Sequence, residues 1–344
     1  MHMADALISP GMGGVMWVTA AGLASCAAKK VHQELDERKV PLMGVLGAFV
    51  FAAQMINFTI PGTGSSGHLG GGLLLAILLG PSAAFLTIVS ILTIQALFFA
   101  DGGLLALGCN IFNLGFFPCF IAYPLIYKPI VGNNPSQGRL FLGTIVAAVI
   151  GLQLGAFGVV LETLFSGISE LPFATFALLT QPIHLAIGIM EGLVTAAVVL
   201  FIWKEAPDIL NSAATNQPLG CSPAKRILTG FLAVAIIAAG ALSWFASSKP
   251  DGLEWSIYQT TGELELKAPE GAHSFFAALQ EKIAFLPEYN FKQPAAAVFK
   301  EQEVSSWPSV NPGTSVAGIV GSLLTLLLVY FVGKGLQCFA RHHS

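Results

Sequence analysis

Apolar residues run in long stretches along this chain, and short polar segments separate them. A stretch of about 20 apolar residues with almost no charge is typical of a helix that crosses a lipid bilayer. Nine such stretches stand out, at positions 9–28, 41–60, 68–80, 82–100, 104–127, 140–165, 182–203, 227–245 and 316–332. The third is short, and it could also be joined to the fourth across Gly80 and Pro81 to make a single helix.

The basic residues decide between these two arrangements, because cytoplasmic loops carry an excess of Lys and Arg. If all nine stretches cross and the N-terminus is outside, eleven basic residues fall in the cytoplasm: Lys29, Lys30, Arg38, Lys39, Lys128, Arg139, Lys204, Lys225, Arg226, Lys334 and Arg341. The other five lie in one long outside segment, where this bias is weak: Lys249, Lys267, Lys282, Lys292 and Lys300. Joining the third and fourth stretches would move Lys128 and Arg139 outside.

The pattern therefore predicts an all-α polytopic membrane protein of about nine transmembrane helices. Its N-terminus is outside, its C-terminus is cytoplasmic, and one extracytoplasmic segment separates the last two helices. The third helix is short and lies inside the bundle. Composition agrees, because 54% of the 344 residues are hydrophobic and 10% are charged, against roughly 25% charged residues in soluble domains. Nothing in the sequence indicates a nucleic-acid partner.

Two short motifs in the first apolar stretch resemble processing sites. "LASC" at 23–26 resembles a lipoprotein cleavage box, and "ASCAA" at 24–28 offers small residues to a signal peptidase. A secretory signal has its basic residues before the apolar run, whereas here Lys29 and Lys30 follow it. We therefore expect no cleavage. Removal of Met1 is also not expected, because His2 is too large for the aminopeptidase that removes it. The amine of Met1 is then placed on the outer face.

That amine gives the opening "MHM" a candidate chemistry. The amine of Met1, the deprotonated amide nitrogen of His2 and the Nδ1 of His2 can form two fused chelate rings around one metal ion. A fourth nitrogen would complete a square-planar site, the geometry that favours Ni(II) or Cu(II). The glycine-rich loop at 57–72 ends on the same predicted face and carries His68. Either histidine alone is more often inert, but together they favour metal capture by Met1, His2 and His68.

The opening "MHM" and the stretch "NFTIPGTGSSGHLGGGLLLAILLGPSAAFLTIVSILTIQALFFADGGLLALGCNIFNLG" at 57–115 resemble the substrate-binding (S) components of energy-coupling factor transporters for nickel and cobalt, the NikM and CbiM group. The resemblance covers about residues 1–205. It implies that Met1, His2 and His68 hold the metal, and that the partners are a coupling transmembrane subunit and two ABC-type ATPase subunits. The chain departs from the group at "MADALISP", where many members read closer to "IPDGFLSP".

Three parts follow from this resemblance. Residues 1–205 form a metal-capture domain of seven helices, and residues 206–223 form a cytoplasmic linker. Residues 224–344 form a two-helix part with an extracytoplasmic segment at 247–312. Residues 250–254, "PDGLE", resemble a motif of the small NikN-type accessory subunit, here fused to the C-terminus. An ordinary turn at Pro250–Gly252 is the alternative.

Three further polar residues are candidates for positioning or gating the metal. His184 and Glu191 are seven residues apart, on one face of a predicted span, where a carboxylate is a functional candidate. Packing by hydrogen bonds is an equally good account of Glu191. Asp101 could orient a ligand histidine through its second nitrogen, although "DGG" also suits a turn.

Small residues at four-residue intervals in the first stretch, Ala20, Ala24 and Ala28, let two helices approach closely. In the resembled transporters such a ridge packs against the coupling subunit. Packing within the bundle is the alternative.

The sequence thus predicts a non-enzymatic subunit of a prokaryotic cytoplasmic membrane that captures Ni(II), or Co(II), for an ATP-driven importer. It has no nucleotide-binding motif, because "GTGSSGHL" at 62–69 has His68 where a phosphate-binding loop needs lysine. The alternative function is an autonomous, gradient-driven divalent metal permease, in which His184 and Glu191 would relay the ion.

Overall fold

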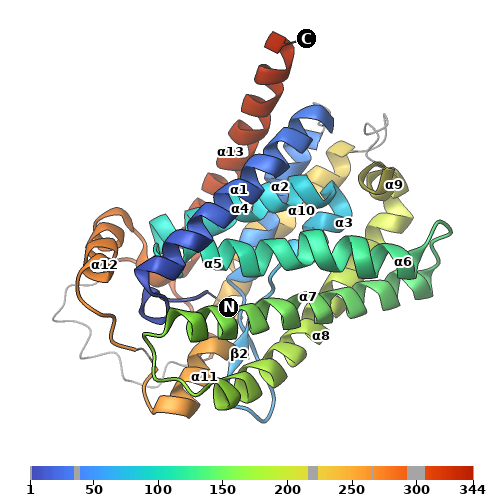
Figure 1. The fold of residues 1–344 in the computed structure, drawn as a ribbon. Coiled ribbons are helices and arrows are strands. Elements are labelled where there is room, and N and C mark those ends of the chain that lie inside the picture. The colour runs from blue at the N-terminus through green and yellow to red at the C-terminus, as the bar shows by residue number, and fades with distance from the viewer. Residues whose placement is uncertain (1, 35–38, 216–223, 265, 293–306, 344) are drawn as a thin grey trace.

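The protein is a bundle of helices with one very short hairpin (Figure 1). The structure, a computed structural model, describes residues 2–34, 39–215, 224–264, 266–292 and 307–343. The elements of the first part of the chain are η1 (Asp5–Leu7), α1 (Pro10–Glu34), α2 (Lys39–Gln54), β1 (Phe58–Thr59), β2 (Ser66–Gly67), α3 (Gly72–Leu79), α4 (Pro81–Phe99), α5 (Leu107–Ile111), η2 (Phe112–Tyr127), α6 (Lys128–Val131), α7 (Gln137–Ser166), α8 (Phe173–Glu205) and α9 (Pro207–Thr215). Those that follow are α10 (Ala224–Gly240), η3 (Leu242–Phe245), α11 (Gly252–Thr261), α12 (Ala272–Ile283), η4 (Pro287–Tyr289) and α13 (Pro312–His343).

Among the described residues, six helical segments are long and apolar enough to cross a membrane. They are Pro10–Gln33, Pro81–Phe99, Leu107–Val131, Gln137–Ser166, Phe173–Glu205 and Pro312–Gln337. This confirms a helical, multi-pass architecture but not the predicted count of nine. The three other predicted spans correspond to α2, α3 and α10, whose 16, 8 and 17 residues fall short of the usual length of about 20.

The helix α3 is the shortest of these three, and all its residues are buried. Eight residues of α-helix rise only about 12 Å, whereas the hydrocarbon core is about 30 Å thick. Gly71 (φ 74°) precedes α3 and Gly80 (φ 86°) follows it, so the chain turns at both ends in a conformation that glycine adopts easily. A short helix inside the bundle, as predicted, is what the structure contains.

Proline is tolerated inside two of the helices, and one of them therefore begins earlier than predicted. The span predicted to start at Pro182 starts nine residues earlier, at Phe173. Proline removes one backbone hydrogen bond, but neighbouring helices in a membrane bundle accommodate the loss. The element η2 is a π-helix that contains Pro118 and Pro124, and such wide turns are frequent at functional sites.

Loops meet at two ends of the bundle. At one end, Ser247 N–H donates to Asn57 O (2.8 Å) and the Gln280 side chain donates to Gly102 O (2.8 Å). At the other, Lys128 Nζ donates to Ala214 O (3.2 Å). We call the first of these the loop end. The number of crossings and the end that faces the cytoplasm stay predictions.

The C-terminal part packs directly into the bundle. The helix α13 lies against α2, α4 and α10, and α11 lies against α8. Glycines allow the close approach of α13 and α2, since a Cβ on Gly47 would lie 3.3 Å from Thr325 Cγ2. The predicted parts 1–205 and 224–344 therefore share a core. The predicted linker 206–223 contains α9, which packs on α3 and α8, while 216–223 lie outside the described residues.

Candidate metal centre

The residues after the first position enter the loop end of the bundle as an extended segment held by its backbone. Met3 is 0% exposed. Its N–H donates to the side-chain oxygen of Asn110 (2.7 Å), and its carbonyl accepts from the Asn110 amide (3.3 Å) and from Gly103 N–H (2.9 Å). Because both polar groups of the Met3 backbone are satisfied, the position of the preceding His2 is fixed.

The imidazole of His2 lies between two polar side chains and is 7% exposed. Its Nε2 is 3.1 Å from Gln95 Oε1, and its Nδ1 is 3.3 Å from Asp101 Oδ1. Asp101 was expected to hold the second nitrogen of a ligand histidine, which would be Nε2. The structure gives that position to Gln95 and places Asp101 beside Nδ1.

A relay of amides fixes which nitrogen of His2 carries the proton. Gly70 O can only accept, and it accepts from Gln54 Nε2 (2.8 Å). Gln54 Oε1 therefore accepts from Gln95 Nε2 (2.9 Å), and Gln95 Oε1 is left to accept from His2 Nε2. The neutral ring then has its lone pair on Nδ1, the nitrogen that a chelate with the chain terminus uses.

His68 follows the hairpin β1–β2 and lies against His2, with the ring centroids 5.1 Å apart and the planes at 25°. Its Nδ1 is 3.1 Å from Leu69 O. A carbonyl accepts only from N–H, so Nδ1 carries the proton and Nε2 carries the lone pair. Carbonyls of Leu69 and Gly70, in the loop itself, thus set the tautomers of both histidines.

Burial keeps both rings neutral at physiological pH. It lowers the pKa of His2, although the nearby Asp101 opposes the shift. It also lowers the pKa of His68, to about 3, and the neighbouring His2 adds to the effect. Neutral imidazole is the form that binds metals, so protons do not compete for these rings near pH 7.

Glu191 holds the backbone of the loop that carries His68. The carboxylate is 3% exposed and accepts from Gly70 N–H (2.8 Å) and Gly71 N–H (3.1 Å). Gln54 donates to the carbonyl of the same Gly70. Side chains from α2 and α8 therefore hydrogen-bond to both polar groups of the Gly70 backbone. Glu191 thus makes hydrogen bonds within the bundle, and a role in positioning or gating the metal stays a prediction.

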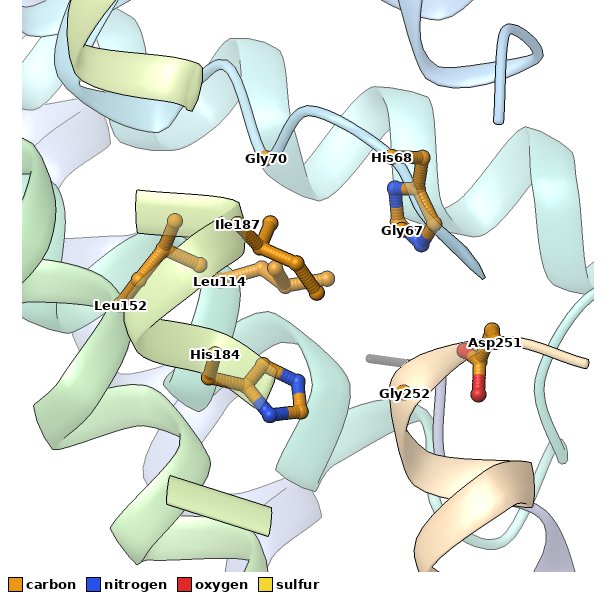
Figure 2. Close-up of a pocket in the computed structure, with 9 residues that line it drawn as sticks. All are labelled: Gly67, His68, Gly70, Leu114, Leu152, His184, Ile187, Asp251 and Gly252. Carbon is orange, nitrogen blue, oxygen red and sulfur yellow. The ribbon is translucent and has the colours of Figure 1, made fainter. Parts of the chain in front are cut away.

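His184 lies on the same face of α8 as Glu191 and is 1% exposed. Its Nδ1 donates to Thr180 O (2.8 Å). A small cavity, large enough for one water molecule, brings it together with His68 from the loop and Asp251 from the start of α11 (Figure 2). The sequence analysis did not include Asp251 among the site residues.

Asp251 begins α11 as its N-cap. Its side chain accepts from Leu253 N–H and Glu254 N–H, both at 2.8 Å, and Glu254 returns a bond to Asp251 N–H (2.9 Å), which completes a capping box. Burial would raise the pKa of Asp251, but nearby positive charge and the hydrogen bond from Glu254 N–H bring it below its usual range. Asp251 is therefore a carboxylate at neutral pH.

The buried amides of Gln54, Gln95 and Asn110 were also missed. Each lies in a predicted apolar span and is at most 5% exposed. A polar side chain inside a span was the available signal, since in a membrane such groups need partners. Their hydrogen-bond partners are far away in the sequence. The signal therefore indicates that each amide has a partner inside the bundle, but it does not indicate which residue that partner is.

The alanine ridge of α1 lies against the core of this chain. Ala20 is 3% exposed, and Ala24 and Ala28 are half-buried against the same core. The exposed face of α1 carries other residues, such as Val15 and Val18. The ridge therefore packs at least partly within the bundle, and its contact with a coupling subunit stays a prediction.

Met1, the remaining predicted ligand, lies outside the described residues. Within the described part of the chain, no three or more His, Cys, Asp and Glu side chains are grouped so that they could hold a metal ion.

Comparison with known proteins covers both parts of the chain. Residues 2–209 match the family described as cobalt uptake substrate-specific transmembrane region, CbiM, and residues 225–337 match the PDGLE domain. A relative from Archaeoglobus fulgidus is 29% identical over 352 residues, 99% of each chain. The fused nickel transport protein NikMN of Rhodobacter capsulatus is 28% identical over 79% of this chain and 80% of its own.

The cobalt transport protein CbiM of Geobacter sulfurreducens is 28% identical over 61% of both chains. A crystal structure of a transition metal transporter is 32% identical and superposes with a TM-score of 0.52, covering 59% of this chain and 93% of that one. Relatives of this kind are transport proteins, and six apolar helices fit a multi-pass membrane protein. Because residues 2–209 match the one family and residues 225–337 match the other, the chain belongs to the CbiM family of metal transport proteins and carries a fused, NikN-like PDGLE domain.

Proposed function

We propose that this chain captures Ni(II), with Co(II) as the second candidate, at the extracytoplasmic face of a prokaryotic cytoplasmic membrane. It delivers the ion as the substrate-specificity (S) subunit of an ATP-driven energy-coupling factor importer. Its partners are a coupling transmembrane subunit and two ABC-type ATPase subunits, and the chain itself binds no nucleotide. Relatives named as nickel or cobalt transport proteins support the substrate class.

The observation that carries the proposal is the pairing of two neutral histidines, 66 positions apart in the sequence, at the loop end. His2 Nδ1 and Asp101 Oδ1 are 3.3 Å apart. In the neutral His2 tautomer described above, Nδ1 has a lone pair, and Asp101 Oδ1 also has only lone pairs to offer. Two acceptors so close repel each other unless a cation neutralises them. The arrangement therefore favours binding of a positive ion beside His2.

The proposed ligands are the amine of Met1, the amide nitrogen and Nδ1 of His2, and Nε2 of His68. Four nitrogens in one plane suit Ni(II). Asp101 supplies negative charge beside the ion. The hydrogen bonds of Gln54 and Glu191 with the Gly70 backbone keep the loop of His68 in place. Groups that orient metal ligands in this way commonly affect metal affinity about 10- to 100-fold.

Reconstitution into lipid vesicles tests the role in transport. The chain alone is expected to bind radioactive nickel stoichiometrically without sustained accumulation, because it lacks an energy source. Addition of the coupling subunit, the ATPase subunits and ATP should produce accumulation, and the His2→Ala variant should not support it. Sustained uptake by the chain alone, driven by a proton or metal gradient, would instead identify it as an autonomous permease.

A further inference from the structure

The PDGLE part of the chain reaches the metal centre at two places. Tyr289 donates from its hydroxyl to Asp101 Oδ2 (2.5 Å), and Asp101 in turn lies beside His2. Asp251 lines the same cavity as His68 (Figure 2). Each histidine therefore has a neighbouring carboxylate that the C-terminal part either holds or supplies.

Backbone hydrogen bonds attach this part to the hairpin that carries His68. Ser66 N–H donates to Pro250 O (2.8 Å), and the Ser66 hydroxyl donates to Lys249 O (2.7 Å). At the base of the hairpin, Ser247 N–H donates to Asn57 O (2.8 Å). The segment 247–250 thus runs beside the hairpin and fixes it two residues before His68.

Both the hairpin and the start of α11 press against α8 through glycine. A Cβ on Gly67 would lie 2.5 Å from Ile187 Cγ1, and a Cβ on Gly252 would lie 2.5 Å from Ile183 Cγ2. These distances are too short for any side chain. The close approach brings Asp251 and His68 to one cavity with His184 as its third polar wall.

We propose that residues 249–252 form an anionic wall of the metal-capture site, in which Asp251 attracts the incoming divalent cation while the backbone of Lys249 and Pro250 holds the loop of His68. The inference rests on the proposed function. Asp251 is half-buried, so its charge acts both on the cavity and on ions that approach from outside. It acts as a positioning and attracting charge and does not join the four nitrogen ligands.

Negative charge that lines the entrance of an enclosed site raises the association rate of a cation by about 10-fold or more, and salt suppresses the effect. The Asp251→Asn variant isolates this charge, because asparagine caps a helix as well as aspartate does. Glu254→Gln is the matched control. It removes one charge three residues away, its side chain is exposed, and glutamine can also complete a capping box.

The experiment mixes the purified full-length protein with nickel chloride and follows binding by absorption at two ionic strengths. We expect Asp251→Asn to bind roughly 10-fold more slowly and more weakly, with an unchanged absorption spectrum and a smaller dependence on salt. Glu254→Gln should behave as the unaltered protein does. In the unaltered protein, the association rate should fall as salt is added, a result that requires no variant.

Any of three results would overturn the inference. The first is an association rate in the unaltered protein that does not respond to salt, and the second is Asp251→Asn binding at the same rate as Glu254→Gln. The third is an altered absorption band in Asp251→Asn, which would place the carboxylate among the ligands. In each case the unaltered protein would still bind nickel, whereas failure of the proposed function would abolish binding in all three proteins.

Discussion

Acetylation of Met1, or extension of the chain before it, is expected to abolish high-affinity nickel binding while the protein still folds. Both changes replace the amine with an amide and break the terminal chelate, which supplies three of the four proposed nitrogens. We expect a loss on the order of 1,000-fold, equivalent to about 4 kcal/mol. Nickel titration of the modified and unmodified proteins measures this loss directly.

Acetylation is the sharper of the two changes, because an extension could also prevent the segment from fitting between the helices. The backbone of Met3 is buried and bonded to Asn110 and Gly103, so added residues must find space at an enclosed site. The same extension at the C-terminus is the control. Tight binding by the acetylated protein would eliminate the amine as a ligand.

His68→Ala has the second largest expected effect. The terminal residues would still supply three nitrogens, but the fourth position would pass to water and the ion would exchange freely. We expect nickel affinity to fall roughly 10- to 100-fold or more, the scale on which loss of an orienting or coordinating group acts. The midpoint of thermal unfolding without metal should not change, because Gly70 and Gly71 keep their bonds to Glu191.

His32→Ala is the control for that variant, since His32 bonds to Leu336 O (2.7 Å), on α1 and α13, and does not contact either ligand histidine. It should bind nickel as the unaltered protein does. If His68→Ala retained both the affinity and the absorption spectrum of the unaltered protein, the loop at 57–72 would have no part in binding the ion.

The placement of His2 and His68 on one face could be predicted because it depends only on the number of crossings, and the resemblance to nickel and cobalt transporters indicated that they pair. Counting crossings places the N-terminus and the loop after the second span on one face, and the structure brings the two rings to 5.1 Å. The helices around them were predicted from long apolar runs. Their ends were not, because in a bundle proline no longer marks a boundary, as Pro182 inside α8 demonstrates.

The surroundings of the two histidines could not be predicted, because they depend on contacts between distant parts of the chain. The relay from Gly70 through Gln54 and Gln95 to His2 joins residues 16, 41 and 93 positions apart. The contact of Ser66 with Pro250 spans 184 positions. Such contacts are set by the packing of α2, α4, α8 and the C-terminal part, which no local sequence pattern specifies.

One measurement tests the central claim most directly, namely that terminal nitrogens and the loop histidine together bind nickel. Nickel chloride is titrated into the purified full-length protein, and the visible absorption and magnetic susceptibility of the complex are recorded. Four nitrogens in a plane, one of them a deprotonated amide, impose a strong ligand field, so the account predicts one ion per chain in a yellow, diamagnetic complex. A pale, paramagnetic, six-coordinate complex, or no stoichiometric binding, would contradict it.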